Sequence, residues 1–124
     1  MRAYIINLDA EPRRWAAAVE AFGRVGVPVD RVPAVWGENL ELPMSAYDEE
    51  RYRRFHGRPT NLAEVGCYLS HVQACRAFLA TGDTHGLIAE DDLVLKPDFS
   101  TALEAAFRWR GSWNVLRLSG LGTG

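Results

Sequence analysis

The chain has 124 residues, of which 48% are hydrophobic, and its 14 basic and 16 acidic side chains give a formal net charge of −2. A chain of this length fills about one domain around a single core. The balanced charge argues against a nucleic-acid partner, and the sequence shows neither a signal peptide nor the roughly 18 apolar residues that span a bilayer. We therefore expect a soluble cytoplasmic protein, with peripheral association at the inner face of a membrane as an alternative.

The first half of the chain predicts alternating strands and helices. Residues 3–8 form an apolar run typical of a buried strand. Pro12 suits the first turn of a helix that extends to about Arg24. The apolar face of this helix is expected to consist of Trp15, Val19, Phe22 and Val25. Residues 29–35 predict a second strand, which Pro33 restricts to the edge of a sheet. Residues 46–55 are rich in charges and predict a solvated helix.

The second half continues this alternation. Asn61 and Glu64 resemble a capping box at the start of a long helix, which should end at Ala80 before Gly82. Its apolar face is expected to consist of Leu62, Val65, Leu69, Val72, Cys75 (or Arg76) and Leu79. Residues 86–89 predict a third strand, residues 97–107 a helix, residues 113–118 a last strand and residues 119–124 a loop. The order of elements predicts an α/β fold, a Rossmann-like three-layer sandwich with a mostly parallel sheet.

Three consecutive carboxylates, Glu90, Asp91 and Asp92, follow the third predicted strand. They should therefore lie at the carboxyl edge of a parallel sheet, where open α/β folds bind their ligands. Adjacent carboxylates repel one another unless a cation or hydrogen-bond donors lie among them. We therefore expect a binding function here, and the alternative is a solvated turn or a cluster that caps a helix.

Cys67 and Cys75 are the only cysteines, and both fall in the long predicted helix. Eight residues of helix separate them by about 12 Å, which is too far for a disulfide. We expect free, buried thiols, which fits a reducing compartment. His71 lies between them on the same helix face, but one straight helix cannot surround a metal ion with three ligands. A zinc site formed by these three residues is therefore not expected.

Four segments, in this order, resemble glycosyltransferase family 25, the lipopolysaccharide-type β-galactosyltransferases and their relatives. They are residues 4–9 (YIINLD) with Arg13 and Arg14, residues 31–37 (RVPAVWG), residues 60–71 (TNLAEVGCYLSH) and residues 87–92 (LIAEDD). The resemblance covers roughly residues 3–118 and corresponds to the N-terminal half of family members. It implies an incomplete GT-A-like fold, in which residues 1–124 form a single sugar-nucleotide-binding α/β domain.

The resemblance also implies an activity. A metal-dependent glycosyltransferase of this family would transfer a sugar to a saccharide acceptor such as lipopolysaccharide or another glycan. The expected sugar is galactose, and the expected donor is UDP-galactose. A divalent metal would neutralise the pyrophosphate leaving group, and Mn²⁺ is expected in preference to Mg²⁺. Asp92 and Glu90, at alternate positions, would bind this metal. Contacts to the donor would come from Asn7, Asp9, Arg13, Thr60, Glu64, Ser70, His71 and Asp91.

Some of these roles have structural alternatives. Arg13 and Arg14 could bind the phosphates or could be surface residues of the first helix. His71 could contact the ligand or could be a structural histidine. Trp36, which precedes a glycine in a predicted loop, is the tryptophan best placed to stack on a base or sugar. An inverting transferase also needs a carboxylate base, which the sequence does not identify and which we expect beyond Gly124.

The main competing hypothesis is a truncated, non-catalytic remnant that binds a sugar nucleotide or a partner, which the missing second half favours. A phosphoacceptor receiver domain is disfavoured because its acidic pair should follow the first strand, and because Lys96 lies too close to the acids. A Ser70–His71 hydrolase pair is disfavoured because adjacent helical residues point about 100° apart. The sequence predicts neither the linkage nor the oligomeric state.

Overall fold

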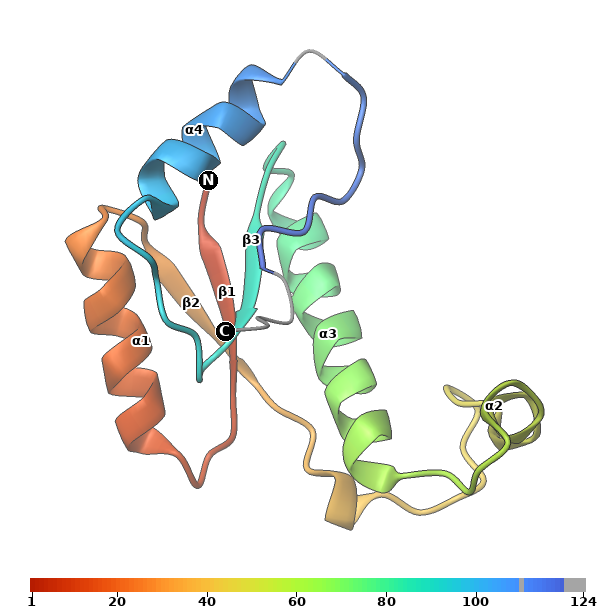
Figure 1. Ribbon diagram of the computed structural model, residues 1–124. Helices are drawn as coiled ribbons and strands as arrows, with labels where there is room; N and C mark the ends of the chain where they lie inside the picture. Colours follow the sequence, from red (N-terminus) through yellow and green to blue (C-terminus); the bar gives the residue numbers. More distant parts are fainter. Residues whose placement is uncertain (110, 120–124) are drawn as a thin grey trace. The chain divides into compact units, whose positions relative to one another are not determined.

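The computed structural model describes residues 1–109 and 111–119. The chain divides into two compact units, residues 1–93 and the remainder from Val94 onward. Within the described ranges, no helix combines the length and the apolar composition needed to cross a membrane. The first unit contains the sheet and carries the candidate site, so it is described first (Figure 1).

The first unit is built on a parallel sheet with the strand order β2-β1-β3. In the central strand every residue is buried, which explains its continuous apolar sequence. Ile6 in this strand pairs with Val32 on one side and with Glu90 on the other. Pro33 ends an edge strand, as predicted. The strands are β1 (Ala3–Asn7), β2 (Val29–Pro33) and β3 (Leu87–Glu90).

Two helices, α1 (Pro12–Arg24) and α3 (Leu62–Thr81), cover opposite faces of this sheet (Figure 1). Tyr4 and Ile6 pack in a cluster with residues of α3, whereas the alternate residues of β1 face the other side. The predicted α/β class, parallel sheet and layered arrangement are thereby confirmed, as an incomplete Rossmann-like sandwich. The predicted bounds of the α1 helix are also confirmed.

The buried faces of these helices agree with the predicted ones at Phe22 and Val65 but otherwise differ, because small residues occupy the remaining buried positions. In α1 the buried residues are Ala18 and Phe22, whereas Val19 is exposed. In α3 they are Val65, Gly66, Ser70 and Ala74. Leu79, which we expected on the apolar face, is 71% exposed. The expected burial of Cys67 and Cys75 was also wrong, although both thiols are free.

The ends of α3 follow the predicted local signals. The side chain of Asn61 accepts a hydrogen bond from the backbone N–H of Ala63, and the helix is closed by Gly82 at a φ of 72°. A left-handed backbone of this kind favours glycine because it has no Cβ. The capping box is not completed in the expected way, since the Glu64 carboxylate accepts hydrogen bonds from Tyr52 and Arg58 instead.

Between β2 and α3 the chain forms a short 3₁₀ helix, η1 (Gly37–Asn39), and the helix α2 (Glu49–His56). The predicted solvated helix is confirmed, because α2 has no buried residue and carries acidic residues in its first turn and basic residues in its last turn. It begins at residue 49, later than predicted. Its start is fixed by Asp48, whose carboxylate accepts a hydrogen bond from the N–H of Arg51.

The second unit contains the helix α4 (Phe99–Arg108) within its described residues. The predicted strand over residues 113–118 was wrong, because these residues are irregular. Apolar residues there suggested a strand, but Val115 is 89% exposed. A strand also needs a neighbour for its backbone N–H and C=O groups, and the described part of the chain gives this segment no pairing. Residues 120–124 of the predicted terminal loop lie outside the described residues.

Candidate functional site

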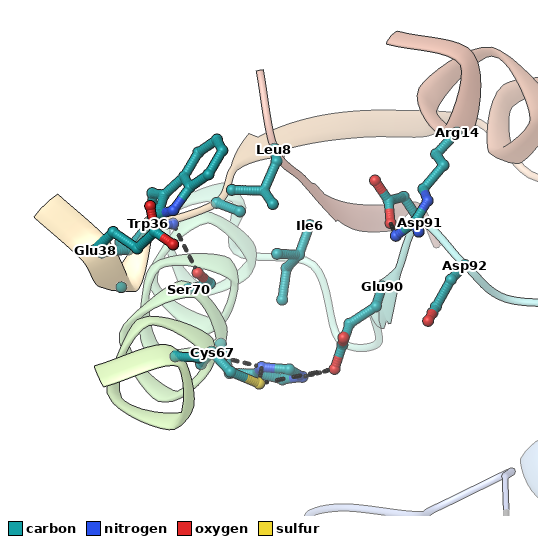
Figure 2. Close-up of a pocket in the computed structure, with 15 residues that line it drawn as sticks. Ile6, Leu8, Arg14, Trp36, Glu38, Cys67, Ser70, Glu90, Asp91 and Asp92 are labelled. Carbon is teal, nitrogen blue, oxygen red and sulfur yellow. Dashed lines mark hydrogen bonds and ion pairs between the residues drawn. The ribbon is translucent and has the colours of Figure 1, made fainter. Parts of the chain in front are cut away.

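A pocket with a volume of about 280 Å³ lies at the carboxyl ends of β1 and β3, beside the N-terminal half of α3 (Figure 2). All of its lining residues belong to the first unit. The carboxyl edge of a parallel sheet is where open α/β folds bind ligands. The polar and aromatic residues that line it are Arg14, Trp36, Glu38, Cys67, Ser70, His71, Glu90, Asp91 and Asp92.

One wall of the pocket depends on two glycines, Gly37 and Gly66, which allow residues 35–37 to lie directly against α3. A Cβ atom on Gly66 would be 2.5 Å from the carbonyl oxygen of Val35, and one on Gly37 would be 2.3 Å from that of Leu62. The Ser70 hydroxyl accepts a hydrogen bond from the Val35 N–H at 2.8 Å and donates one to the Gly66 carbonyl at 2.7 Å. These contacts hold the segment that carries the neighbouring Trp36.

Asn7 lies beneath the pocket and is 1% exposed. Its amide nitrogen donates to the Asp91 carboxylate at 2.5 Å and to the Glu11 carbonyl at 2.9 Å. Its amide oxygen accepts a hydrogen bond from Arg31 at 2.7 Å, and the same arginine is 2.6 Å from Asp9. The side chain of Asn7 is therefore fully engaged, and it fixes the position of Asp91.

The three consecutive carboxylates diverge, which reduces the repulsion expected between them. Asp91 points toward Arg14, 3.8 Å from its guanidinium, and its side chain is 10% exposed. Glu90 points toward α3 instead (Figure 2). Asp92 is exposed at the pocket and makes no hydrogen bond or ion pair with another described residue. Asn7 and Arg14 therefore bind the middle carboxylate, whereas Asp92 remains available to a ligand and Glu90 has only long contacts, at 3.8 Å, with α3.

Glu90 meets a thiol and an imidazole from α3. Its Oε1 atom is 3.8 Å from the Cys67 sulfur and 3.8 Å from Nε2 of His71. Partial burial raises the pKa of the Cys67 thiol above its usual value, and the negative charge of Glu90 raises it further. The spacing of Cys67 and His71 was recognisable in the sequence, but their nearness to Glu90 was not.

One predicted site residue, Glu64, lies in a separate group beside α2, which we call the Glu64 cluster (Tyr52, Arg58 and Glu64). Tyr52 donates a hydrogen bond to Glu64 at 2.6 Å, and Arg58 donates one at 2.9 Å. These two hydrogen bonds hold the pKa of Glu64 below its usual value, that from Tyr52 contributing most. Thr60 lies nearby, 3.4 Å from the Tyr47 hydroxyl. Neither Thr60 nor Glu64 lines the pocket.

The structure thus gathers part of the predicted set at one place. Ser70, His71, Glu90, Asp91 and Asp92 line the pocket, and Asn7 supports it from below. Asp9, Arg13, Thr60 and Glu64 do not line it. Sequence reasoning missed Cys67 as a pocket residue, and it named Arg13 among the donor contacts, whereas Arg14 is the arginine that lines the pocket. For the arginines, the available signal was helix geometry, which points adjacent side chains in different directions.

The sequence matches the family described as "Glycosyltransferase family 25 (LPS biosynthesis protein)" over residues 1–121. A "Glycosyltransferase 25 family member" of Anopheles gambiae is 30% identical over 91% of this chain and 20% of its own length, and one of Aedes aegypti is 28% identical with the same coverage. The mouse "Inactive glycosyltransferase 25 family member 3" is 24% identical over 93% of this chain and 21% of its own length.

The chain therefore spans about a fifth of the length of these curated relatives. No solved structure gives a significant match. The family match nevertheless extends over nearly the whole chain, and it includes the four segments that line the pocket. This chain belongs to glycosyltransferase family 25.

Proposed function

We propose that this chain is the donor-binding part of a metal-dependent glycosyltransferase. It would bind a UDP-sugar, for which UDP-galactose is the leading candidate. The sugar would be transferred to a saccharide acceptor such as lipopolysaccharide or another glycan. The observation that carries this proposal is the pocket at the carboxyl edge of the parallel sheet, which is lined by Glu90, Asp92 and Arg14. Membership of glycosyltransferase family 25 supports the choice of a sugar nucleotide.

The donor atoms at the pocket fit a hard divalent cation. Glu90 and Asp92 are exposed carboxylates, and carboxylate oxygens are the ligands that Mn²⁺ and Mg²⁺ prefer. Asp91 fits less well as a ligand because its oxygens are occupied by Asn7 and Arg14. We therefore assign Asp92 and Glu90 as metal ligands, with Mn²⁺ as the leading candidate. A bound cation would neutralise charge that develops on the diphosphate leaving group.

The other pocket residues suggest how the chain itself would bind the donor. Arg14 can pair with a phosphate through its guanidinium group, which is a strong, directional interaction. The exposed indole of Trp36 offers a surface on which a base or sugar can stack. Asp91, held in place by Asn7, can accept a hydrogen bond from a ribose or sugar hydroxyl. Ser70 contributes indirectly, because its hydroxyl holds the pocket wall.

This proposal is tested by calorimetric titration of the purified chain with UDP in the presence and absence of Mn²⁺. We expect binding that requires Mn²⁺ and that weakens at least about tenfold in Asp92→Ala, because a metal ligand is lost. Asp83→Ala is the matched control, since Asp83 is an exposed acid of the same unit that does not line the pocket. Binding without Mn²⁺, no binding at all, or equal binding by Asp92→Ala would contradict the proposal.

A second candidate function is binding of the sugar nucleotide without transfer. The name of the mouse relative, which describes that protein as inactive, favours keeping this candidate. The two functions are separated by incubating the chain with UDP-galactose, Mn²⁺ and a saccharide acceptor, and measuring released UDP. Release of UDP above a protein-free control would exclude a binding-only function. Tight binding without release would support it.

A further inference from the structure

Cys67, His71 and Glu90 bring three different kinds of metal-ligating atom together. A sulfur, an imidazole nitrogen and a carboxylate oxygen from these residues all lie within 4.8 Å of one another. The first two residues occupy adjacent turns of α3, and the third ends β3, so the ligands come from two directions (Figure 2). One straight helix cannot surround an ion with three ligands, but here the third ligand atom comes from a strand.

The hydrogen bonding of His71 leaves one ring nitrogen free to bind a metal. Its Nδ1 atom is 3.0 Å from the backbone carbonyl oxygen of Cys67. A carbonyl oxygen can only accept, so Nδ1 carries the proton, and in the neutral ring Nε2 then has an available lone pair. Metal-ligating histidines are commonly oriented by such a bond from their other ring nitrogen. Here Nε2 faces the Glu90 oxygen at 3.8 Å.

The separations between the ligand atoms are close to those of a zinc site. Tetrahedral geometry with Zn–N and Zn–O bonds near 2.0 Å and Zn–S bonds near 2.3 Å places ligand atoms about 3.3–3.6 Å apart. The sulfur and Nε2 are each 3.8 Å from the Glu90 oxygen, so these two separations need a contraction of only a few tenths of an ångström, and the sulfur is 3.7 Å from Nδ1 of the same imidazole ring. The cluster adjoins the pocket, which leaves a fourth position for water or another ligand.

The chemistry of the ligands favours a different metal from the one proposed for donor binding. Thiolate and imidazole ligands favour Zn²⁺ and similar transition metals over Mn²⁺ and Mg²⁺, which prefer oxygen. We infer that Cys67, His71 and Glu90 form a binding site for a transition metal of the Zn²⁺ class. This site shares Glu90 with the ligand set proposed for Mn²⁺, but it does not depend on the transferase activity.

The inference is tested by titrating the purified, reduced chain with Co²⁺, which replaces Zn²⁺ and reports its ligands by absorption. We expect a thiolate-to-cobalt charge-transfer band that saturates at one Co²⁺ per chain and disappears when Zn²⁺ is added. Cys67→Ser should lose the band. Cys75→Ser should retain it, because Cys75 is the other free, exposed cysteine of the same helix and lies outside the cluster.

Two further variants keep the inference falsifiable. Glu90→Gln should weaken Co²⁺ binding at least about tenfold, because a charged ligand is lost. Asp92→Ala should retain the band, which separates this site from the Mn²⁺ ligands even if UDP does not bind. Circular dichroism shows whether each variant remains folded. Absence of the band in the unaltered chain, or an equal band in Cys67→Ser, would overturn the inference.

Discussion

Two carboxylates of the first unit, Asp91 and Glu64, both accept hydrogen bonds from neighbouring side chains, but they differ in their exposure to water. Asp91 accepts a hydrogen bond from the buried amide of Asn7, and its side chain is 10% exposed. Glu64 accepts hydrogen bonds from Tyr52 and Arg58, and its side chain is 43% exposed. Water can replace a lost partner at the exposed group but not at the buried one. The same chemistry therefore fixes the position of a pocket residue in one region and contributes little to stability in the other.

The largest effect is expected on the buried side, at the contact that forms the pocket wall. Gly66→Ala should lower the free energy of unfolding by about 3 kcal/mol, because the new Cβ would overlap backbone atoms that cannot move easily. Urea unfolding followed by tryptophan fluorescence measures this change. The control is Gly23→Ala in α1, where a Cβ meets nothing within 4 Å and alanine favours the helix. Equal stability of the two variants would show that α3 does not lie as close to residues 35–37 as the structure indicates.

A smaller loss is expected when the buried carboxylate loses its donor. Asn7→Ala should cost about 2 kcal/mol, because the Asp91 carboxylate and the Glu11 carbonyl each lose a partner in a region with little water. The same unfolding experiment measures the loss. Asn39→Ala replaces an exposed asparagine of η1 and should leave the transition unchanged. A comparable loss in both variants would remove the distinction between the buried and exposed regions.

The exposed region should respond much less to a similar change. Arg58→Ala removes an ion pair with Glu64, but both groups are accessible to water, which can solvate the remaining carboxylate. The urea midpoint should therefore coincide with that of the unaltered chain within the error of the measurement. A shift as large as that of Asn7→Ala would indicate that the Glu64 cluster is part of the folded core.

The smallest effect concerns the titration of a single exposed carboxyl group. The hydrogen bond from Tyr52 lowers the pKa of Glu64, so its contribution to stability is present above the ordinary value of 4.5 and is lost as the pH falls through the lower folded-state pKa. Carboxyl NMR should give a midpoint below 4.5 for Glu64. Tyr52→Phe should move that midpoint upward, because the ring remains while the donor is removed. An unchanged midpoint would show that this hydrogen bond does not form in solution.

Features that depend on interactions within a few residues could be predicted from the sequence, whereas features that depend on distant partners could not. Pro12, Asn61 and Gly82 marked helix ends correctly because caps and breakers act through neighbours within a few residues. The buried strand β1 and the edge position of β2 could also be predicted from short segments, an apolar run and the missing N–H of Pro33. Residues 113–118 show the limit of this reasoning, since an apolar composition does not provide the partner that a strand requires.

The candidate site shows the same division. The sequence placed Glu90, Asp91 and Asp92 at the carboxyl end of a strand, and the structure confirms this placement. It did not reveal that Asp91 bonds Asn7 across 84 positions of the sequence, or that Glu90 meets Cys67 across 23. The assignment of the three carboxylates to different partners therefore came from the fold.

By itself, the sequence determined the α/β class, most helix bounds, the position of the acidic cluster and the likeness to glycosyltransferase family 25. These features depend on local backbone preferences, on hydrophobic periodicity and on motifs that can be read along the chain. Only the tertiary structure decided which carboxylate is engaged, which arginine reaches the pocket and which carboxylate lies against Cys67 and His71. These contacts join residues that are distant in the sequence, and the wall of the pocket depends on the close approach of α3 to residues 35–37, which Gly66 permits.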